Sequence, residues 1–266
     1  FKQPTILLGI VTLICLQGAQ AQTLTATTGT SIKISSGTVV SLATITVKAG
    51  STIVNDGTLT TTTSATALTL ECGATTGSII SGSGLLTLGG NVSVNAAGVG
   101  TSGATISCPV DLGAVTPTFT VADNTTIPST NTDTDLIVSN VISGNGGITK
   151  AGAGTLLLSG ANTYTGLTTV NVGTLDIRNN SALGSITAGT VVFDGAALNI
   201  GGGINIGAET LDIAGVGPSQ NAALDFVSGD NTWGGAITLS KDATIRNQSG
   251  NLNISNSITL GSYQLT

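Results

Sequence analysis

The central stretch of the chain, residues 144–177, consists of short alternating apolar runs divided by glycines. A weaker copy of its centre returns at residues 228–235, where each matched residue lies at a constant offset, as Trp233 does from Tyr164 (233 − 164 = 69). In a repeat protein each unit stacks on the next, and no unit buries a core alone. The repeat therefore restricts the possible folds more than any single residue does.

A shorter period is marked by a triplet of Gly, Thr and a branched aliphatic residue. The triplet occurs at residues 37–39, 57–59, 154–156, 173–175 and 189–191, with gaps of 57 − 37 = 20, 173 − 154 = 19 and 189 − 173 = 16. The longer offset would then contain three or four such units. Units of this length, with period-two alternation and Gly/Asn turns, are typical of coils of a parallel β-helix. Because glycine interrupts nearly every helical window, we predict an all-β β-solenoid.

Residues 1–21 have the layout of a secretory signal peptide. Lys2 precedes an apolar run over residues 6–14, and the small-x-small sequence at residues 19–21 follows it. The run is shorter than the about 20 apolar residues of a membrane-spanning helix. The residues before Cys15 are not the small ones that a lipoprotein signal requires. We therefore predict cleavage after Ala21.

The predicted mature domain, residues 22–266, contains the strongest repeat at 144–177 and a degenerate copy at 224–258. Charged residues make up 8% of the chain, whereas about 25% is usual in globular domains. The hydrophobic content of 40% nevertheless provides enough apolar surface to bury. Stacked coils place equivalent side chains above one another, which favours ladders of Thr, Ser and Asn and disfavours stacked like charges.

The charge balance argues against a nucleic-acid partner. Without Lys2 the domain has 7 − 1 = 6 basic residues against 13 acidic ones. Binding to a phosphate backbone requires clustered Lys or Arg, and the basic residues here are scattered along the chain. We predict no contact with nucleic acid.

Two cysteines, Cys72 and Cys108, remain after removal of the signal peptide, and an oxidising compartment favours a disulfide between them. Their separation in sequence (108 − 72 = 36) is close to two coils. A disulfide requires Cα atoms within about 7 Å, whereas coils two apart lie about 9.6 Å from each other. A disulfide and two buried reduced thiols therefore remain alternatives.

The central motif resembles the autotransporter-associated β-strand repeat, also called the passenger-associated transport repeat. The residues that carry this resemblance are Gly144, Gly146, Lys150, Gly152, Gly154, Thr155, Leu156, Leu158, Ser159, Gly160, Asn162, Thr163, Tyr164, Gly166, Thr168, Gly173, Thr174 and Leu175. The resemblance implies a right-handed parallel β-helix, secreted from a bacterium or displayed at its surface in association with the outer membrane. It implies no catalytic residues.

The resemblance also implies an outer-membrane translocator, which we expect to lie outside this chain. No run of amphipathic strands of about 10 residues follows Ser228. The chain begins with Phe1 rather than Met and stops at Thr266 inside what resembles another repeat, so we expect a fragment truncated at its C-terminus. An uncapped last coil leaves open strand edges, which predicts end-to-end self-association or fraying.

Catalysis is the main alternative because parallel β-helices also host polysaccharide lyases and hydrolases. The chain has no His, which excludes Ser-His-Asp and Cys-His arrangements and removes the usual nitrogen ligand of zinc. Paired carboxylates remain. In an extended chain Asp133 and Asp135 point the same way, so they can hold Ca²⁺ through oxygen ligands or form a polar turn between coils.

The other distinctive residues have structural interpretations. Four acids alternate with apolar neighbours and are predicted on the outer, solvated face: Asp176, Asp194, Asp212 and Asp225. Lys150 is expected to lay its stem on apolar surface and keep its ammonium in water. Tyr164 and Trp233 are expected to pack against the neighbouring coil, and an exposed aromatic that binds a glycan is the alternative. We predict no catalytic, cofactor-binding or metal-binding residues, and no cofactor.

The sequence therefore predicts a non-enzymatic stalk or adhesin segment of an autotransporter-like passenger, which supports its own translocation. The alternative is a β-helix that binds carbohydrate or cleaves polysaccharide. The expected partner is a host or glycan surface ligand, and the sequence does not identify it.

Overall fold

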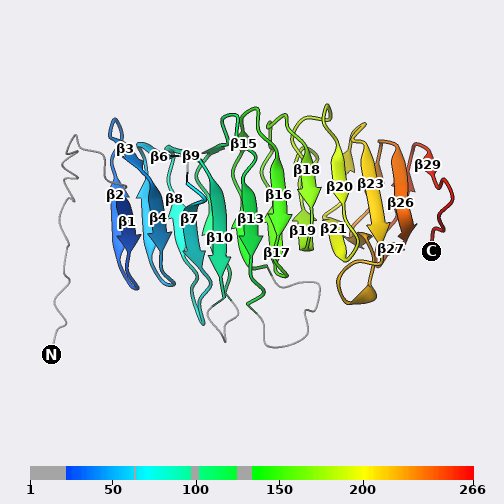
Figure 1. Cartoon of the computed structure of the whole chain (residues 1–266), viewed down its shortest axis with the longest axis horizontal. Coiled ribbons are helices and arrows are strands. Elements are labelled where there is room, and N and C mark those ends of the chain that lie inside the picture. The colour runs from blue at the N-terminus through cyan, green and yellow to red at the C-terminus, as the bar shows by residue number, and fades with distance from the viewer. Residues whose placement is uncertain (1–21, 63, 97–101, 125–133) are drawn as a thin grey trace.

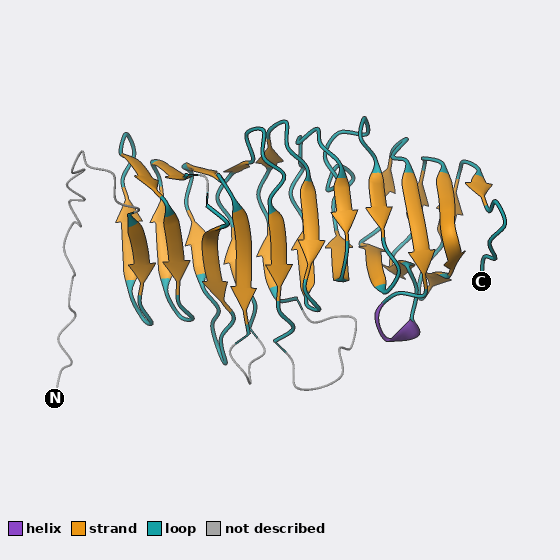
Figure 2. Ribbon diagram, viewed as in Figure 1, coloured by secondary structure: helices purple, strands orange, loops and turns teal. Residues whose placement is uncertain are grey.

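The computed structural model of the chain describes residues 22–62, 64–96, 102–124 and 134–266, which form a parallel β-solenoid of about ten coils (Figure 1). The coils stack in chain order from the N-terminal (blue) end to the C-terminal (red) end. The strands of each face pair in parallel, and the arrows in Figure 2 follow one another along the stack. The predicted all-β parallel solenoid is confirmed.

Three faces surround the interior. The 11-stranded sheet consists of β1 (Thr23–Ala26), β4 (Thr44–Val47), β7 (Thr66–Glu71), β10 (Asn91–Asn95), β13 (Thr118–Val121), β16 (Ile148–Ala151), β18 (Thr168–Val170), β20 (Thr190–Val192), β23 (Leu211–Gly215), β26 (Ile237–Ala243) and β29 (Ile258–Thr259). The 10-stranded sheet consists of β2 (Ser31–Ile34), β5 (Thr52–Asn55), β8 (Ile79–Ser81), β11 (Ala104–Ile106), β14 (Leu136–Val138), β17 (Thr155–Leu158), β19 (Gly173–Ile177), β21 (Ala196–Gly201), β24 (Leu224–Ser228) and β27 (Ile245–Asn247).

The third face is divided between two smaller sheets. Its N-terminal part is a 5-stranded sheet of β3 (Val39–Leu42), β6 (Thr58–Thr61), β9 (Leu85–Thr87), β12 (Val110–Asp111) and β15 (Ile142–Ser143). Its C-terminal part is a 3-stranded sheet of β22 (Asn205–Ile206), β25 (Asn231–Trp233) and β28 (Leu252–Ile254). The short 3-10 helix η1 (Pro218–Gln220) lies in the connection from β23 to β24.

Columns of apolar side chains fill the interior, with one residue from each coil. One column of the 10-stranded sheet runs through Ile32, Ile53, Ile80, Ile106, Val138, Leu158, Ile177, Ile200 and Phe226. β-Branched residues suit these positions because they pack well on a pleated surface. Burial of each such side chain contributes about 1.5–3 kcal/mol. No coil has a separate core, so stability comes from the stacking of neighbours.

The longer offset of the sequence corresponds to three coils. Thr168 pairs with Thr190, Thr190 with Leu211, and Leu211 with Ile237, and 237 − 168 = 69. Tyr164 and Trp233 each lie four positions before the ends of this series, and both side chains are fully buried. These two aromatics therefore occupy the same place in coils three apart, as the sequence predicted.

The prediction that each Gly-Thr-aliphatic triplet marks one coil was only partly correct. The triplets at 154–156 and 173–175 both lie at the start of strands in the 10-stranded sheet, where Thr155 pairs with Thr174. The triplet at 189–191 instead begins β20 of the 11-stranded sheet. The interval between the triplets at 173–175 and 189–191 is therefore the distance from one face to another and not the length of a coil.

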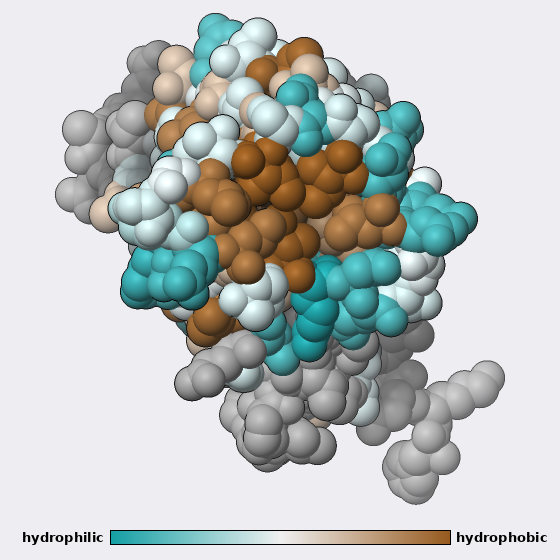
Figure 3. Space-filling model, turned by 90° about the vertical axis from the view of Figure 1, so that its right-hand side faces the viewer, coloured by the Kyte–Doolittle hydropathy of each residue, from teal (hydrophilic) through white to brown (hydrophobic). Residues whose placement is uncertain are grey.

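The C-terminal end of the solenoid presents a group of apolar side chains (Figure 3). Ile245, Leu252, Ile254 and Ile258 are partly buried against the core, and Leu260 is exposed. The predicted signal peptide, residues 1–21, lies outside the described residues. Within the described ranges, no helix is long and apolar enough to cross a membrane.

Candidate functional site

The proposed calcium pair is only half described, because Asp133 lies outside the described residues. Asp135 is buried, and both of its carboxylate oxygens accept backbone N–H groups, from Asn124 at 2.9 Å and from Thr155 at 2.8 Å. These bonds connect the residues between β13 and β14 of one coil with the first residue of β17 in the next coil. Burial raises the pKa of Asp135 above its ordinary value. The arrangement favours the turn interpretation, in which the carboxylate satisfies backbone donors.

Lys150 is not where the sequence placed it. Its side chain is fully buried in the inner column between Phe119 and Val170, and its ammonium is not in water. The ammonium donates to the carbonyl oxygens of Ala151, Gly152 and Val172 at 2.9, 2.7 and 3.1 Å. Burial lowers the pKa of Lys150 to about 7. The expectation that the lysine snorkels was wrong because three carbonyls at the turns of two coils replace its hydration.

The two cysteines are free and buried. Cys72 follows β7 of the 11-stranded sheet, whereas Cys108 follows β11 of the 10-stranded sheet, so they occupy different points on the circuit of a coil. The Cys72 thiol lies 3.4 Å from the main-chain oxygen of Asp135. Burial raises the pKa of both thiols to about 11. Of the two alternatives, the structure therefore shows two buried reduced thiols, which are expected to be inert, and not a disulfide.

A second polar group lies inside the solenoid. Thr168 and Thr190 occupy adjacent places in an inner column, where Tyr164 Oη lies 2.7 Å from Thr168 Oγ1 and Thr190 Oγ1 donates to Glu209 Oε1 at 2.8 Å. Glu209 is buried, and burial raises its pKa to about 7. Tyr164 is packed beneath Gly184, whose missing Cβ leaves room for the ring. The buried tyrosine is therefore a structural anchor and does not offer an exposed platform for a sugar.

The 10-stranded sheet carries an outward-facing polar ladder across four coils, which we call the ionic ladder. Asp176 pairs with Asn199, Asn199 with Asp225, and Asp225 with Arg246. Arg178 binds Asp176 through two contacts of 2.7 Å. The sequence placed these acids on the outer face correctly. The expectation that Asp176 and Asp225 are solvated was wrong, because they are only 5% and 1% exposed.

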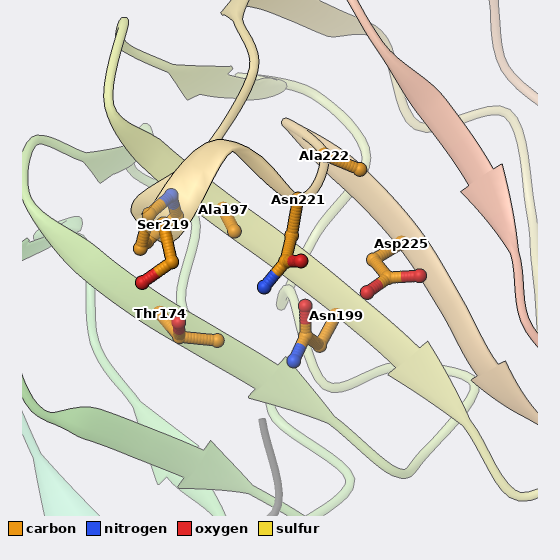
Figure 4. Close-up of a pocket in the computed structure, with 8 residues that line it drawn as sticks. Thr174, Ala197, Asn199, Ser219, Asn221, Ala222 and Asp225 are labelled. Atoms are coloured by element: carbon orange, nitrogen blue, oxygen red, sulfur yellow. The ribbon is translucent and has the colours of Figure 1, made fainter. Parts of the chain in front are cut away.

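Ion pairs and a loop account for this burial. The Arg246 guanidinium contacts both Asp225 oxygens, at 3.1 and 2.5 Å, and Gln248 donates to the same carboxylate at 2.7 Å. The connection that contains η1 folds over the sheet, and Figure 4 shows Asn221 reaching from it toward Asn199, with Asp225 beside them. Asp194 is exposed and Asp212 is partly buried, so the prediction of a solvated side chain is correct for Asp194.

The loop encloses a small polar depression rather than a cleft. Its walls come from Thr174 and Asn199 on the sheet and from Ser219 and Asn221 on the loop. Ser219 has a φ of 53°, the only positive φ of a residue other than Gly among those described. Burial raises the pKa of Asp176 to about 6, and the negative charge of Asp225 contributes to this increase. Both carboxylates are held by arginines, and Asp225 is also one of the residues that line the depression.

The sequence contained a signal for the ionic ladder that we did not use. Three tripeptides of the form Leu, polar, apolar occupy equivalent strand positions, at residues 175–177, 198–200 and 224–226. Their central residues are three of the four members of the ladder, Asp176, Asn199 and Asp225. In the described part of the chain, no group of three or more His, Cys, Asp or Glu side chains is placed to hold a metal ion.

The outer face of the 11-stranded sheet differs from the ionic ladder. Two rows of uncharged side chains, which we call the hydroxyl rows, cross it, the first from β1 to β18 and the second from β1 to β16. The first row consists of Thr23 and Thr44, which pair with each other, and then of Thr66, Asn91, Thr118, Thr149 and Thr169, of which Thr66 pairs with Asn91 at a register shift. The second consists of Thr25, Thr46, Thr69, Ser93, Thr120 and Ala151. Thr23, Thr25, Thr66 and Thr120 are exposed, and the other side chains of the rows are partly buried.

The comparisons with known proteins agree with this architecture. Residues 148–177 match the model of a protein family described as Passenger-associated-transport-repeat. Over 179 residues the chain is 32% identical to the Adhesin BmaC autotransporter of Brucella suis biovar 1 (strain 1330), a match that covers 61% of this chain and 5% of the adhesin. No solved structure matches the chain.

The chain is thus a parallel β-solenoid that contains a segment similar to the passenger-associated transport repeat. This chain carries a passenger-associated transport repeat and is distantly related to an adhesin autotransporter, which confirms the resemblance read from the sequence. The chain spans only 5% of that adhesin's length, so the comparison characterises a segment and not the activity of a whole passenger.

Proposed function

We propose that this chain is a non-enzymatic segment of a secreted or surface-displayed passenger, and that it acts as a stalk with an adhesive outer surface. The observation that carries this proposal is the continuous parallel solenoid that contains the matched repeat at residues 148–177. The similarity to a protein named as an adhesin supports the adhesive role. A solenoid suits this role because stacked coils create an extended surface at a distance from the cell.

Adhesion is tested by display of residues 22–266 on a heterologous translocator in a laboratory Gram-negative strain. Bacteria that carry the chain should adhere to epithelial cell layers more than bacteria that carry the translocator alone. Purified residues 22–266 should compete with this adhesion in solution. Equal adhesion of the two strains would contradict the proposed role.

The non-enzymatic part of the proposal rests on the ionic ladder. Asp176 and Asp225 are the two carboxylates of the outer surface that most resemble a catalytic acid and base. Both are buried and held by arginines. A polysaccharide-cleaving enzyme requires an acid and a base that contact the glycosidic bond. Purified protein should release no reducing ends or unsaturated products from a panel of neutral and acidic polysaccharides with calcium present. Turnover that disappears in Asp225→Asn would overturn this proposal.

We also propose export through the predicted signal peptide, followed by folding that supports translocation. Each coil that forms pairs the backbone groups of the coil before it, so folding outside the membrane opposes backward movement of the chain. Mass spectrometry of the secreted product should find Gln22 at the N-terminus. A product that keeps Phe1 and remains in the cytoplasm would contradict the proposal.

The C-terminal end is proposed to mediate self-association of the isolated chain. Side chains such as Ile254 and Ile258, which a following coil would cover, lie at this end (Figure 3). Light scattering should detect association of residues 22–266 that decreases after Ile254→Lys. A monomer that is unaffected by this substitution would argue against an end-to-end contact.

A further inference from the structure

We propose that the hydroxyl rows of the 11-stranded sheet form a binding surface for an extended, neutral polysaccharide. This inference rests on the proposed adhesive function and assigns its ligand class and its face. The 11-stranded sheet is the one whose labelled strands run across the front of Figure 1.

The rows are regular because the register is regular. Thr23 pairs with Thr44 and Thr25 with Thr46, and the two rows are separated by one inward-facing residue in β1 and β4 and by two buried residues in β7. Adjacent strands lie about 4.8 Å apart, and residues two apart in a strand about 6.6 Å apart. Seven strands therefore present hydroxyls and methyls at repeated spacings over a length of about 29 Å.

A local irregularity preserves the first row. The register of β7 against β10 shifts at Ala67, which is buried, and Thr66 is brought opposite Asn91. Without this shift an alanine would occupy the outward place in the coil. The hydroxyls also interact along the row, since Thr23 Oγ1 lies 2.9 Å from Thr44 Oγ1.

The chemistry of the rows indicates a neutral partner. They contain no charged side chain, and Lys48 and Glu71, which follow the second row at the ends of β4 and β7, pair with each other. The chain is acidic, with a formal net charge of −6, which disfavours a polyanion. Each Thr offers one donor, two acceptor lone pairs and a methyl group, which match the hydroxyls and C–H groups of a sugar.

The geometry indicates an extended ligand. A single hydroxyl contact with a sugar is weak in water, because it replaces hydrogen bonds that both partners already make to the solvent. A polymer that repeats along the solenoid axis can contact several coils at once, and the second and later contacts are then intramolecular. A flat, extended chain of neutral sugars fits this arrangement better than a single monosaccharide does.

The rows end where the surface changes. Beyond β18 the outward positions are Val191 and Phe193 in β20 and its turn, then Asp212 in β23. Phe193 is 51% exposed. The proposed surface is therefore limited to the seven coils from β1 to β18.

The test uses purified residues 22–266 and microcrystalline cellulose, a neutral polymer of extended chains, in a sedimentation assay. The row variant carries Thr46→Val, Thr69→Val and Thr120→Val, which remove three hydroxyls and keep β-branched shape. The matched control carries Thr58→Val, Thr60→Val and Thr87→Val on the 5-stranded sheet. Circular dichroism and thermal unfolding establish that all three proteins fold.

We expect the row variant to bind about tenfold more weakly than the wild type and the control to bind normally. The corresponding Thr→Ser triple variant retains the hydroxyls and should keep most of the binding. Equal loss in the row variant and the control, or stronger binding to alginate than to cellulose, would overturn the inference. So would a wild-type chain that does not bind cellulose.

The cell assay separates this inference from the proposed function. If bacteria that display the row variant adhere to epithelial layers as well as those that display the wild type, the hydroxyl rows are not the adhesive surface and the adhesive function stands. If bacteria that display the wild type do not adhere, the proposed function itself fails.

Discussion

The outer faces of the two large sheets have the same backbone plan and very different side chains. The 11-stranded sheet presents the uncharged, accessible hydroxyl rows. The 10-stranded sheet presents the ionic ladder, whose Asp176 and Asp225 are covered by arginines and by the loop around η1. Both faces rest on parallel pairing and inner apolar columns. The comparison teaches that stacking leaves the outer positions free to differ in chemistry.

The largest expected effect lies in the ionic ladder. Asp225→Ala leaves the Arg246 guanidinium and the Gln248 amide without their shared carboxylate. Breaking a buried pair costs about 3–5 kcal/mol, and we expect about 3 because the Arg246 side chain is 35% exposed and water can compensate. Urea unfolding monitored by circular dichroism measures the change.

A surface ion pair provides the control for this prediction. Asp194 and Lys241 form an ion pair in which both side chains are at least half exposed. Asp194→Ala should therefore leave the free energy of unfolding unchanged within error. Similar losses in Asp194→Ala and Asp225→Ala would show that the two outer faces do not differ as proposed.

A smaller effect is expected at Gly201, which lies beneath the Arg178 side chain. A Cβ at this position would be 1.7 Å from Arg178 Nη1, so Gly201→Ala must displace the guanidinium that contacts Asp176 and Ser228. We expect a loss of about 1–2 kcal/mol in the free energy of unfolding. Gly207→Ala is the matched control, because nothing lies within 4 Å of the added Cβ. Equal stability of the two variants would contradict this account.

The ionic ladder should also give the stability a pH dependence. The pKa of Asp176 is raised to about 6 in the folded state, so this group favours folding when protonated and loses that contribution as the pH rises through 6. Asp176→Asn removes this titration. The stability of the variant relative to the wild type should therefore improve by about 1–3 kcal/mol between pH 4 and pH 7. A constant difference across this range would show that Asp176 is not desolvated.

The sequence predicted the parts of the fold that depend on periodicity. Alternation placed residues correctly on inner and outer faces, and the offset between Tyr164 and Trp233 identified coils three apart. It could not predict what covers an outer position. Asp176 and Asp225 were expected in water because alternation alone does not show that Arg178 and Arg246 pair with them.

The contacts of the inward-facing Lys150 were likewise not predictable from alternation. The alternation of residues in its strand places Lys150 on the inner face. We nevertheless expected its ammonium to reach water because isolated charges are costly to bury. The three carbonyls that bind its ammonium come from two coils, including Val172 of the next one. Such partners depend on register between coils, which a local pattern does not contain.

The smallest expected effect concerns the stability contributed by the hydroxyl rows. Thr120 is an exposed member of the second row, and Val is also β-branched and well suited to a strand. Thr120→Val should change the free energy of unfolding by less than about 0.5 kcal/mol, as is usual for surface positions. A loss of more than about 1 kcal/mol would mean that the rows hold the coils together, as the ionic ladder does. A near-neutral result would sharpen the comparison, because a row that contributes little to stability can vary with its ligand without cost to the fold.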